Sequence, residues 1–388
     1  MVGTHTADRV LVVGSWAKEE ITIEHLKQTS SVEVMAFLDV ANPGIMERAD
    51  DYRVGDSSRP DEVVAYAREK QCDLVLVTTA APLKHGLANR LEDAEITCFA
   101  PLREAARLEW DKAFARRLLE KYRPSSLPRF RLCSDATSAS RFCEELSWQV
   151  AVKPLGLTEG LGVRVSGDQL KSPVEVSRYI EEVLETAIGG DHQVLIEERL
   201  VGEEFTLQAL VDGQRLVPTP VVQDFKKLLP GERGPNTASM GSYADSGRLL
   251  PFLKRDLYDE AIEIMRTTLE AAQEETGVAC RGFLYGQFMV TDKGIKLIEY
   301  NFRPGDPEWL NTLATLETPL LDLVTELLDG GEPTAEFRSE ASVVKYVVPD
   351  NYPEKLGEVL EVSFDRDQLD EKGVDLYYLS LIHISEPT

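Results

Sequence analysis

The sequence predicts a soluble α/β protein of several domains, beginning with a doubly wound parallel sheet. Between residues 9 and 101, near-continuous apolar runs alternate with segments of helical periodicity. Buried parallel strands and the helices that cover them produce this pattern. The length of 388 residues exceeds one ordinary core, so we expect two to four domains.

Composition and charge narrow the classes of protein that the chain can represent. Hydrophobic residues make up 43% and charged residues 28%, no apolar run reaches the length of a membrane span, and no signal-peptide core opens the chain. The net charge of −25 argues against a nucleic-acid partner, because phosphate backbones repel acidic proteins. The five scattered cysteines lack metal-ligand spacing and predict reduced thiols in a cytoplasmic protein.

The N-terminal domain has four expected strands joined by helical segments such as Asp61–Gln71. The strands are Arg9–Gly14, Val32–Val40, Asp73–Thr79 and Ile96–Pro101. The first strand ends in Gly-Ser-Trp-Ala-Lys and lacks the Gly-x-Gly-x-x-Gly fingerprint of dinucleotide-binding domains. The domain is therefore Rossmann-like in layout only.

The next segment combines basic residues with a glycine-rich loop. A helix is expected over Glu104–Tyr122. It carries a basic run that, taken alone, indicates a solvated face: Lys112, Arg116, Arg117 and Lys121. After a second helix, a strand ends at Lys153 and leads into a loop with Gly156, Gly160 and Gly162. Such loops let backbone N–H groups approach phosphates, although an ordinary hairpin explains the glycines equally well.

Acidic and amide residues mark the central part of the chain. The helix Val174–Ile188 precedes a strand ending at Glu197, and a second strand begins at Glu204. This strand end can bind an adenine edge and ribose hydroxyls, or it is a plain acidic connection. The following polar segment, residues 217–243, is too long for a hairpin loop, which favours a functional role. It offers a polar substrate the side chains of Asp224, Lys226, Lys227, Asn236 and Thr237.

A predicted hairpin after the amphipathic helix Arg255–Thr276 carries the strongest chemical signal. Its strands are Phe283–Thr291 and Ile295–Phe302, and strict alternation puts Ile295, Leu297, Glu299 and Asn301 on one side. Glu299 and Asn301 would then offer a carboxylate and an amide oxygen to a hard cation such as Mg²⁺. Arg303 follows, and a turn with Asp306 and Glu308 leads into a helix expected over Trp309–Asp329. A solvated strand end with an N-capping Asp306 is the alternative.

Several separated motifs occur together in one order at consistent spacing, and together they resemble the phosphoribosylamine–glycine ligase family of purine synthesis, in its archaeal style. These motifs are LVLVTTAAPLKHG, LEWDKAFARRLLEKY, AVKPLGLTEGLGV, IEERLVGEEFTLQALVDG, VVQDFKK, GPNTASMGSY, YGQFMVTDKG and LIEYNFRPGDPE. The resemblance covers residues 9 to about 375. It implies an ATP-grasp fold with a mobile lid, a central α+β body and an incomplete β-rich C-terminal domain.

The resemblance also implies a role for each site residue in a reaction that uses ATP and Mg²⁺ or Mn²⁺ to join glycine to 5-phosphoribosylamine through an acyl phosphate. Arg303 and Lys153 match catalytic positions, and Glu299 and Asn301 match the metal ligands. The nucleotide-binding positions are Lys112, Lys153, Gly160, Gly162, Glu197, Glu198, Leu200 and Glu204. The substrate-side positions are Asp224, Lys226, Asn236, Thr237, Asp306 and Glu308.

The chain departs from the family pattern mainly on the phosphoribosylamine side. Ser15–Glu20 replaces Gly-Gly-Arg-Glu-His-Ala, and Leu161 replaces the lysine of the glycine loop. These departures leave two alternatives open: a catalytically impaired nucleotide-binding relative, and a ligase for another acid and amine pair.

The expected domain organisation follows the motifs. It comprises a Rossmann-like domain (1–108), a joining helix (109–129), an ATP-grasp lid (130–198), the body (199–335), a partial C-terminal domain (336–380) and a tail (381–388). The tail does not resemble the family and is expected to be non-native, so His383 is not a ligand candidate. We expect a monomer with small-molecule substrates and no membrane partner.

Overall fold

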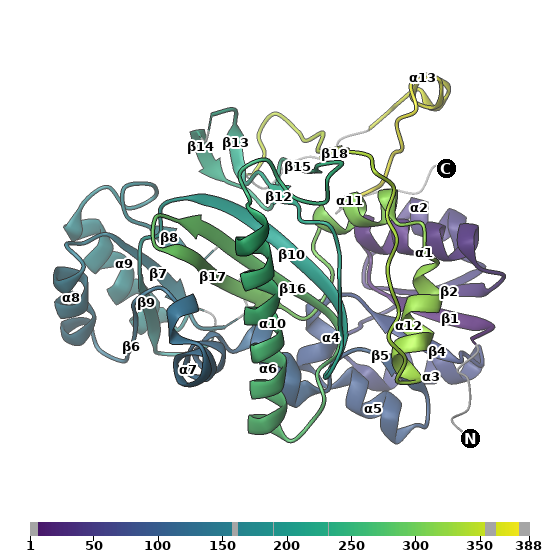
Figure 1. The fold of residues 1–388 in the computed structure, drawn as a ribbon, viewed down its shortest axis with the longest axis horizontal. Helices are drawn as coiled ribbons and strands as arrows, with labels where there is room; N and C mark the ends of the chain where they lie inside the picture. Colours follow the sequence, from purple (N-terminus) through teal and green to yellow (C-terminus); the bar gives the residue numbers. More distant parts are fainter. Residues whose placement is uncertain (1–6, 157–161, 189, 232, 354–361, 380–388) are drawn as a thin grey trace.

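The N-terminal domain is a five-stranded parallel sheet between helices (Figure 1). The computed structural model describes residues 7–156, 162–188, 190–231, 233–353 and 362–379. The strand order is β3-β2-β1-β4-β5, with every neighbouring pair parallel, which confirms the doubly wound prediction. The strands are β1 (Arg9–Val13), β2 (Glu33–Leu38), β3 (Asp51–Val54), β4 (Leu74–Val77) and β5 (Thr97–Phe99).

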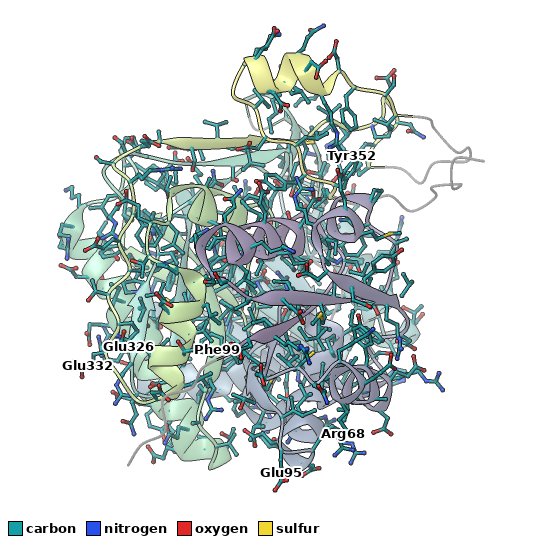
Figure 2. The ribbon with its side chains drawn as sticks, turned by 90° about the vertical axis from the view of Figure 1, so that its right-hand side faces the viewer. Arg68, Glu95, Phe99, Glu326, Glu332 and Tyr352 are labelled. Atoms are coloured by element: carbon teal, nitrogen blue, oxygen red, sulfur yellow. The ribbon has the colours of Figure 1, made fainter. Side chains whose placement is uncertain are left out.

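Strand β3 is an edge strand that the sequence did not reveal. Its residues, DYRV, are half-buried and exposed in alternation, so they lack the apolar run that marks the inner strands. The helices of this domain are α1 (Ala17–Thr29), α2 (Pro43–Arg48), α3 (Pro60–Glu69), α4 (Ala80–Lys84) and α5 (Leu87–Asp93). Figure 2 shows Phe99 of β5 in the interior, where it is fully buried, and Arg68 and Glu95 pointing into solvent.

The predicted helix over residues 104–122 is two helices, α6 (Arg103–Trp110) and α7 (Lys112–Tyr122). Asp111 leaves the helical conformation between them, with φ −119° and ψ 85°. Its carboxylate accepts a hydrogen bond from the Phe114 backbone N–H at 2.9 Å and so caps α7. Because of this break α7 is a separate helix, and its residues Lys112 and Arg116 contact Gly156 and Glu197 of the segment predicted as the lid. A short 3-10 helix, Pro124–Ser126, follows α7.

The segment predicted as the lid, for which this name is kept, is an antiparallel sheet covered by two helices. Its strand order is β6-β9-β7-β8. Its core contains Phe142 of α8 and Ile180 of α9, packed against Val152 and Ile196 of the sheet. The elements are β6 (Phe130–Cys133), α8 (Ala136–Glu145), β7 (Val150–Pro154), β8 (Arg164–Val165), α9 (Pro173–Thr186) and β9 (Val194–Glu198).

The segment predicted as the body, for which this name is kept, contains a four-stranded antiparallel sheet of order β11-β10-β16-β17. The long helix α10 (Arg255–Thr276), with the predicted bounds, lies along it (Figure 1) and buries Ile264 and Leu269 against one face. The strands are β10 (Glu203–Asp212), β11 (Leu216–Pro218), β16 (Arg281–Thr291) and β17 (Gly294–Asn301). The opposite face near the end of β17 is polar.

The segment expected as a long loop, residues 217–243, contains short strands. β12 (Gln223–Asp224) and β15 (Gly241–Ala244) form a small sheet with β18 (Ser342–Lys345), and β13 (Lys227–Leu229) pairs with β14 (Arg233–Asn236). These pairings join residues about a hundred positions apart at β15 and β18, so no local pattern predicts them.

The C-terminal part of the body contains two helices where one was expected. They are α11 (Glu308–Thr315) and α12 (Leu320–Leu328), separated by a segment with Pro319, which cannot continue a helix. Beyond residue 341, the described residues form β18 and the helix α13 (Arg366–Glu371). In the described ranges, no helix has the length and apolar character needed to cross a membrane, and all five cysteines are buried free thiols.

Candidate active site

A β-bulge in β17 decides which side chains face the site. Phe288 of β16 lies opposite Leu297, but the preceding residue, Gln287, lies opposite Glu299, so Ile298 is an extra residue in β17. The extra residue resets the alternation of side chains. Ile295 and Leu297 are buried in the same core as Tyr300 and Phe302. The prediction that Glu299 and Asn301 share the side of Ile295 and Leu297 is therefore wrong, and both polar residues lie on the opposite face.

This polar face extends across the neighbouring strands. Thr206 of β10, Gln287 of β16 and Glu299 lie opposite one another in the register. The Gln287 amide donates a hydrogen bond to Glu204 Oε2 at 2.7 Å, so the proposed ribose contact is held by its neighbour. Gln287 is thus a further residue of the site, and its role was not predicted from the sequence.

A buried group of three charged residues, the hinge cluster, joins the lid to α7. It consists of Arg116, Lys153 and Glu197, each less than a tenth exposed. Lys153 Nζ lies 2.7 Å from Glu197 Oε2, and Arg116 Nε donates to Glu197 Oε1. Burial raises the pKa of Glu197, but the two cations outweigh it and lower this pKa to about 2. The carboxylate is therefore ionised at neutral pH.

The basic run on α7 divides between the interior and solvent. Arg116 is 3% exposed, Arg117 is exposed, and Lys112 is half-buried and donates to the Gly156 carbonyl at 2.8 Å. The expectation of a solvated face is thus wrong for Lys112 and Arg116, which lie one turn apart on one side of α7. Burial lowers the pKa of Lys112, and the neighbouring Lys153 and Arg116 lower it further while Glu299 opposes them.

Glu299 lies in a strongly positive environment. Burial raises its pKa, but four surrounding cations prevail and bring the pKa below its ordinary value. These cations are Lys226, Lys153, Lys112 and Arg303. The hydrogen bonds found within the described ranges leave the Glu299 carboxylate and the Asn301 amide without a protein donor. These two oxygen-bearing groups suit a divalent cation that takes its remaining ligands from phosphates and water. The described residues contain no cluster of three acidic, His or Cys ligands.

Arg303 is held by an acidic residue of α6. Glu109 Oε1 accepts from Arg303 Nε at 3.1 Å, and Glu109 Oε2 accepts from the Phe302 backbone N–H at 2.9 Å. Glu109 is 7% exposed. Burial lowers the pKa of Arg303, but Glu109 and other anionic neighbours raise it above its ordinary value. Glu109 is a site residue that was not predicted from the sequence, although its carboxylate stands within the quoted motif LEWDK.

Asp306 joins the N-terminal domain to the C-terminal segment. Its carboxylate accepts hydrogen bonds from Tyr346 OH at 2.8 Å and from the Lys18 backbone N–H at 3.4 Å. Lys18 and Glu19 are buried at the start of α1. Burial raises the pKa of Glu19 to about 7 against the effect of Lys18. The segment Ser15–Glu20, which differs from the family pattern, is thus part of this site. It lies directly beside Asp306, a predicted substrate-side residue.

The remaining substrate-side residues meet around two carboxyl groups. Glu308 Oε1 accepts from Tyr285 OH at 2.8 Å, and Asp224 Oδ1 accepts from Ser239 Oγ at 2.5 Å. Burial and the neighbouring Glu308 raise the pKa of Asp224 to about 7, against the opposing effect of Lys226. Burial lowers the pKa of Lys226, but Glu204 and Asp224 together with other carboxylates outweigh it and raise this pKa above its ordinary value.

Other predicted residues lie at the margins of this group. Thr237 is buried and donates to the Lys226 carbonyl at 2.9 Å, whereas Asn236 is exposed on β14, so the structure does not bury it with the others. Glu198 Oε1 accepts from the Arg129 backbone N–H at 3.0 Å, and Leu200, two residues further on, is half-buried.

The glycine loop is described only in part. Gly162 is buried, and its carbonyl accepts from Tyr179 OH at 2.5 Å. Gly160 and Leu161 lie outside the described residues.

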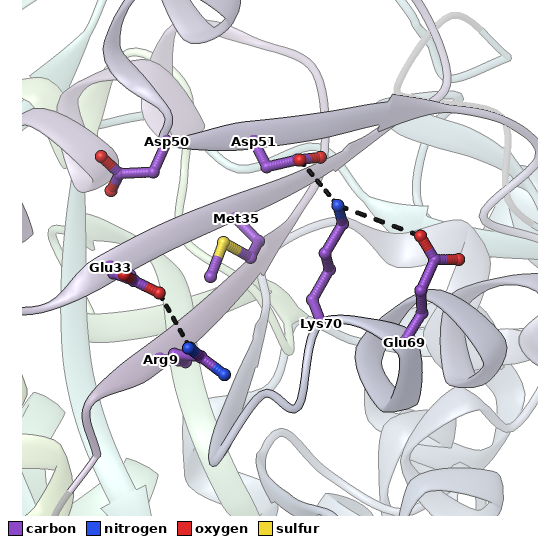
Figure 3. Close-up of a pocket in the computed structure, with 7 residues that line it drawn as sticks. All are labelled: Arg9, Glu33, Met35, Asp50, Asp51, Glu69 and Lys70. Carbon is purple, nitrogen blue, oxygen red and sulfur yellow. Dashed lines mark hydrogen bonds and ion pairs between the residues drawn. The ribbon is translucent and has the colours of Figure 1, made fainter.

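A separate hollow lies at the amino-terminal ends of β1, β2 and β3, the sheet edge away from Lys18 (Figure 3). Its charged residues already pair with one another: Arg9 with Glu33 at 2.8 Å and Lys70 with Asp51 at 2.6 Å. Ligands of doubly wound sheets bind at the carboxyl ends of the strands, so this hollow is not the active-site candidate.

Comparison with known proteins identifies the family. Residues 8–109 match the N domain of phosphoribosylglycinamide synthetase, and residues 110–309 match its ATP-grasp (A) domain. The phosphoribosylamine–glycine ligase of Methanopyrus kandleri is 44% identical, covering 96% of this chain and 84% of the relative. That of Methanobrevibacter smithii is 42% identical, covering 97% and 87%.

A solved structure supports the same assignment. The crystal structure of phosphoribosylamine–glycine ligase from Thermotoga maritima superimposes with a TM-score of 0.74 at 27% identity, covering 89% of this chain and 82% of the other. The matched family models together span well over half of the 388 residues. The chain therefore belongs to the phosphoribosylamine–glycine ligase family, and its fold is that of ATP-grasp enzymes.

Proposed function

We propose that the protein is an ATP-dependent ligase that joins glycine to 5-phosphoribosylamine, forming an amide through an acyl phosphate. The observation that carries the proposal is the position of Glu299 among four cations on the polar face of the body sheet. This arrangement suits phosphoryl transfer, where positioning and charge neutralisation supply most of the catalysis. The family assignment names the two substrates.

ATP is proposed to bind against Lys153 and Glu197 of the hinge cluster and the residues around them. Lys112 and Lys153 supply positive charge for the phosphates, and Glu197 offsets only part of it. Glu198 ends strand β9, and its N–H and that of Arg199 already donate to the carbonyls of Arg129 and Gln149 at 2.8 and 2.9 Å. The Glu198 carbonyl and the Leu200 N–H are therefore the backbone groups proposed to bind the adenine edge. Glu204, held by Gln287, is proposed to bind the ribose hydroxyls.

Glu299 and Asn301 would hold a divalent cation, Mg²⁺ or Mn²⁺, which neutralises negative charge on phosphate oxygens. The bulge at Ile298 is what aims both side chains away from the core. Without that extra residue, strict alternation along β17 would place Glu299 on the core face of the sheet, the face that carries Leu297 and is covered by α10.

Arg303 is proposed to bind the glycine carboxylate and the acyl phosphate. A carboxylate oxygen of glycine attacks the γ-phosphorus of ATP, and the bond to ADP breaks. The amine nitrogen of phosphoribosylamine then attacks the carbonyl carbon, loses a proton, and phosphate leaves with the former carboxylate oxygen. Glu109 keeps the Arg303 guanidinium oriented for both steps.

Asp224, Lys226, Asn236, Thr237, Asp306 and Glu308 are proposed to form the substrate side of the site. The segment Ser15–Glu20 differs from the family pattern, and its residues Lys18 and Glu19 are buried beside Asp306. This difference on the substrate side favours a second candidate function, a ligase of the same class that uses another amine. We further propose that the enzyme is cytoplasmic and monomeric.

An ADP-release assay with single omissions tests the proposal. ATP, Mg²⁺, glycine and phosphoribosylamine are supplied together, and each is then left out in turn, beside a panel of other acids and amines. We expect ADP only with the complete set, and mass spectrometry should detect the glycine amide of phosphoribosylamine. ADP release with a different pair, and none with glycine and phosphoribosylamine, would establish the second candidate instead.

A further inference from the structure

The lid and the metal-facing end of the body are joined by one side chain of α7. The guanidinium of Arg116 donates from Nε to Glu197 Oε1 and from Nη2 to the Ile298 carbonyl, the latter at 2.6 Å. Glu197 belongs to lid strand β9, and Ile298 is the bulge residue of body strand β17. A planar guanidinium can satisfy two acceptors at once in a fixed geometry.

We propose that Arg116 is a positioning residue, which fixes the nucleotide hinge relative to Glu299 so that ATP and its cation are bound as one unit. This inference rests on the proposed function and adds a residue to it. Arg116 touches neither substrate nor cofactor in the arrangement described above, so its effect passes through Glu197 and Ile298.

Both contacts have a definite consequence for the site. Glu197 accepts from Lys153 as well, so a shift of its carboxylate would move a proposed phosphate-binding lysine. The Ile298 carbonyl belongs to the residue directly before Glu299, at the irregularity that aims this carboxylate toward the cations. A loss of the Ile298 contact would therefore loosen the backbone that positions Glu299.

Burial makes the contacts of Arg116 difficult to replace. Arg116 and Glu197 are each 3% exposed, so water cannot replace a lost partner. Removal of the Arg116 guanidinium leaves the buried Glu197 carboxylate with Lys153 but without its second cation, and it also removes the donor to the Ile298 carbonyl. The same burial distinguishes Arg116 from its neighbour Arg117, which is exposed on the same helix and supplies a matched control.

The test compares Arg116→Gln and Arg116→Lys with Arg117→Gln and the parent protein. Isothermal titration calorimetry measures ATP binding with and without Mg²⁺, and steady-state kinetics measures KM for ATP and for glycine. We expect Arg116→Gln to weaken ATP binding about tenfold, the scale of one charge-assisted hydrogen bond. The factor by which Mg²⁺ tightens ATP binding should shrink, and the KM for glycine should stay at the parental value.

Arg116→Lys restores the positive charge, and its ATP affinity should lie between those of Arg116→Gln and the parent. This variant also carries the test if Arg116→Gln does not fold, because a measurable loss relative to Arg117→Gln is still expected. Parental ATP affinity and Mg²⁺ dependence in the Arg116 variants, with a lowered Tm alone, would show a purely structural role and overturn the inference. Calorimetry needs no turnover, so a parent that binds ATP but fails to ligate glycine refutes the proposed substrates and leaves the Arg116 test intact.

Discussion

Glu109→Gln should selectively impair the use of glycine. The Glu109 carboxylate accepts from Arg303 Nε at 3.1 Å and from the Phe302 N–H at 2.9 Å. A glutamine of the same shape has only one acceptor oxygen, so its NH₂ group must face one of these two donors. The substitution therefore removes one charge-assisted hydrogen bond and leaves the Arg303 guanidinium without its buried counter-charge.

The size of the effect follows from the kind of contact that is lost. A hydrogen bond to a charged group contributes about 1.5–3 kcal/mol, which corresponds to roughly tenfold to hundredfold in kcat/KM. We expect kcat/KM for glycine to fall within this range. The ATP affinity should change by less than about twofold, the level of a small electrostatic perturbation, because the contacts of Glu109 do not include the hinge cluster.

Steady-state kinetics with varied glycine, paired with calorimetry for ATP, measures both quantities. Glu104→Gln is the matched control, because Glu104 lies on the same helix and is exposed. If Glu109→Gln kept parental glycine kinetics and lost only thermal stability, Arg303 would not need this anchor and the reasoning would fail.

Three further predictions concern charge in the site. Glu299→Gln should lower kcat by about tenfold or more while changing ATP affinity less, because the lost charge acts mainly in the transition state; unchanged kcat would place the metal elsewhere. The raised pKa of Asp224, about 7 against an ordinary 3.8, costs stability as pH rises through this window. Urea unfolding of Asp224→Asn should therefore show a smaller loss of stability between pH 5 and pH 8 than the parent, and equal losses would argue against this assignment. Leu161→Lys should raise turnover about tenfold by adding a cation over the phosphates, and an equal or slower rate would show that another group serves there.

Local patterns predicted the elements whose structure is set locally. Helix α10 has the bounds that its amphipathic period indicates, and the β16–β17 hairpin follows from two strand-like runs around Asp292-Lys293-Gly294. The pairing of β15 with β18 depends on chain segments far apart. The break between α6 and α7 depends on a single capping residue, Asp111, within an otherwise continuous helical pattern.

The candidate site could be predicted in its composition but not in its orientation. Glu299 and Asn301 were identified, yet strict alternation placed them on the core side, because a one-residue bulge arises from the register between two strands. Arg116 was read as a solvated residue, although its spacing of four from Lys112 indicates a shared helix face. Its buried role depends on Glu197 and Ile298, which come from two other domains of the fold.

The central claim is that the glycine carboxylate is activated as an acyl phosphate. Glycine labelled with heavy oxygen in its carboxylate tests this directly, because the acyl phosphate transfers one carboxylate oxygen to phosphate when the amine displaces it. We expect the inorganic phosphate released with ADP to carry one labelled oxygen, only when phosphoribosylamine is present. Inorganic phosphate without label during product formation would contradict the account.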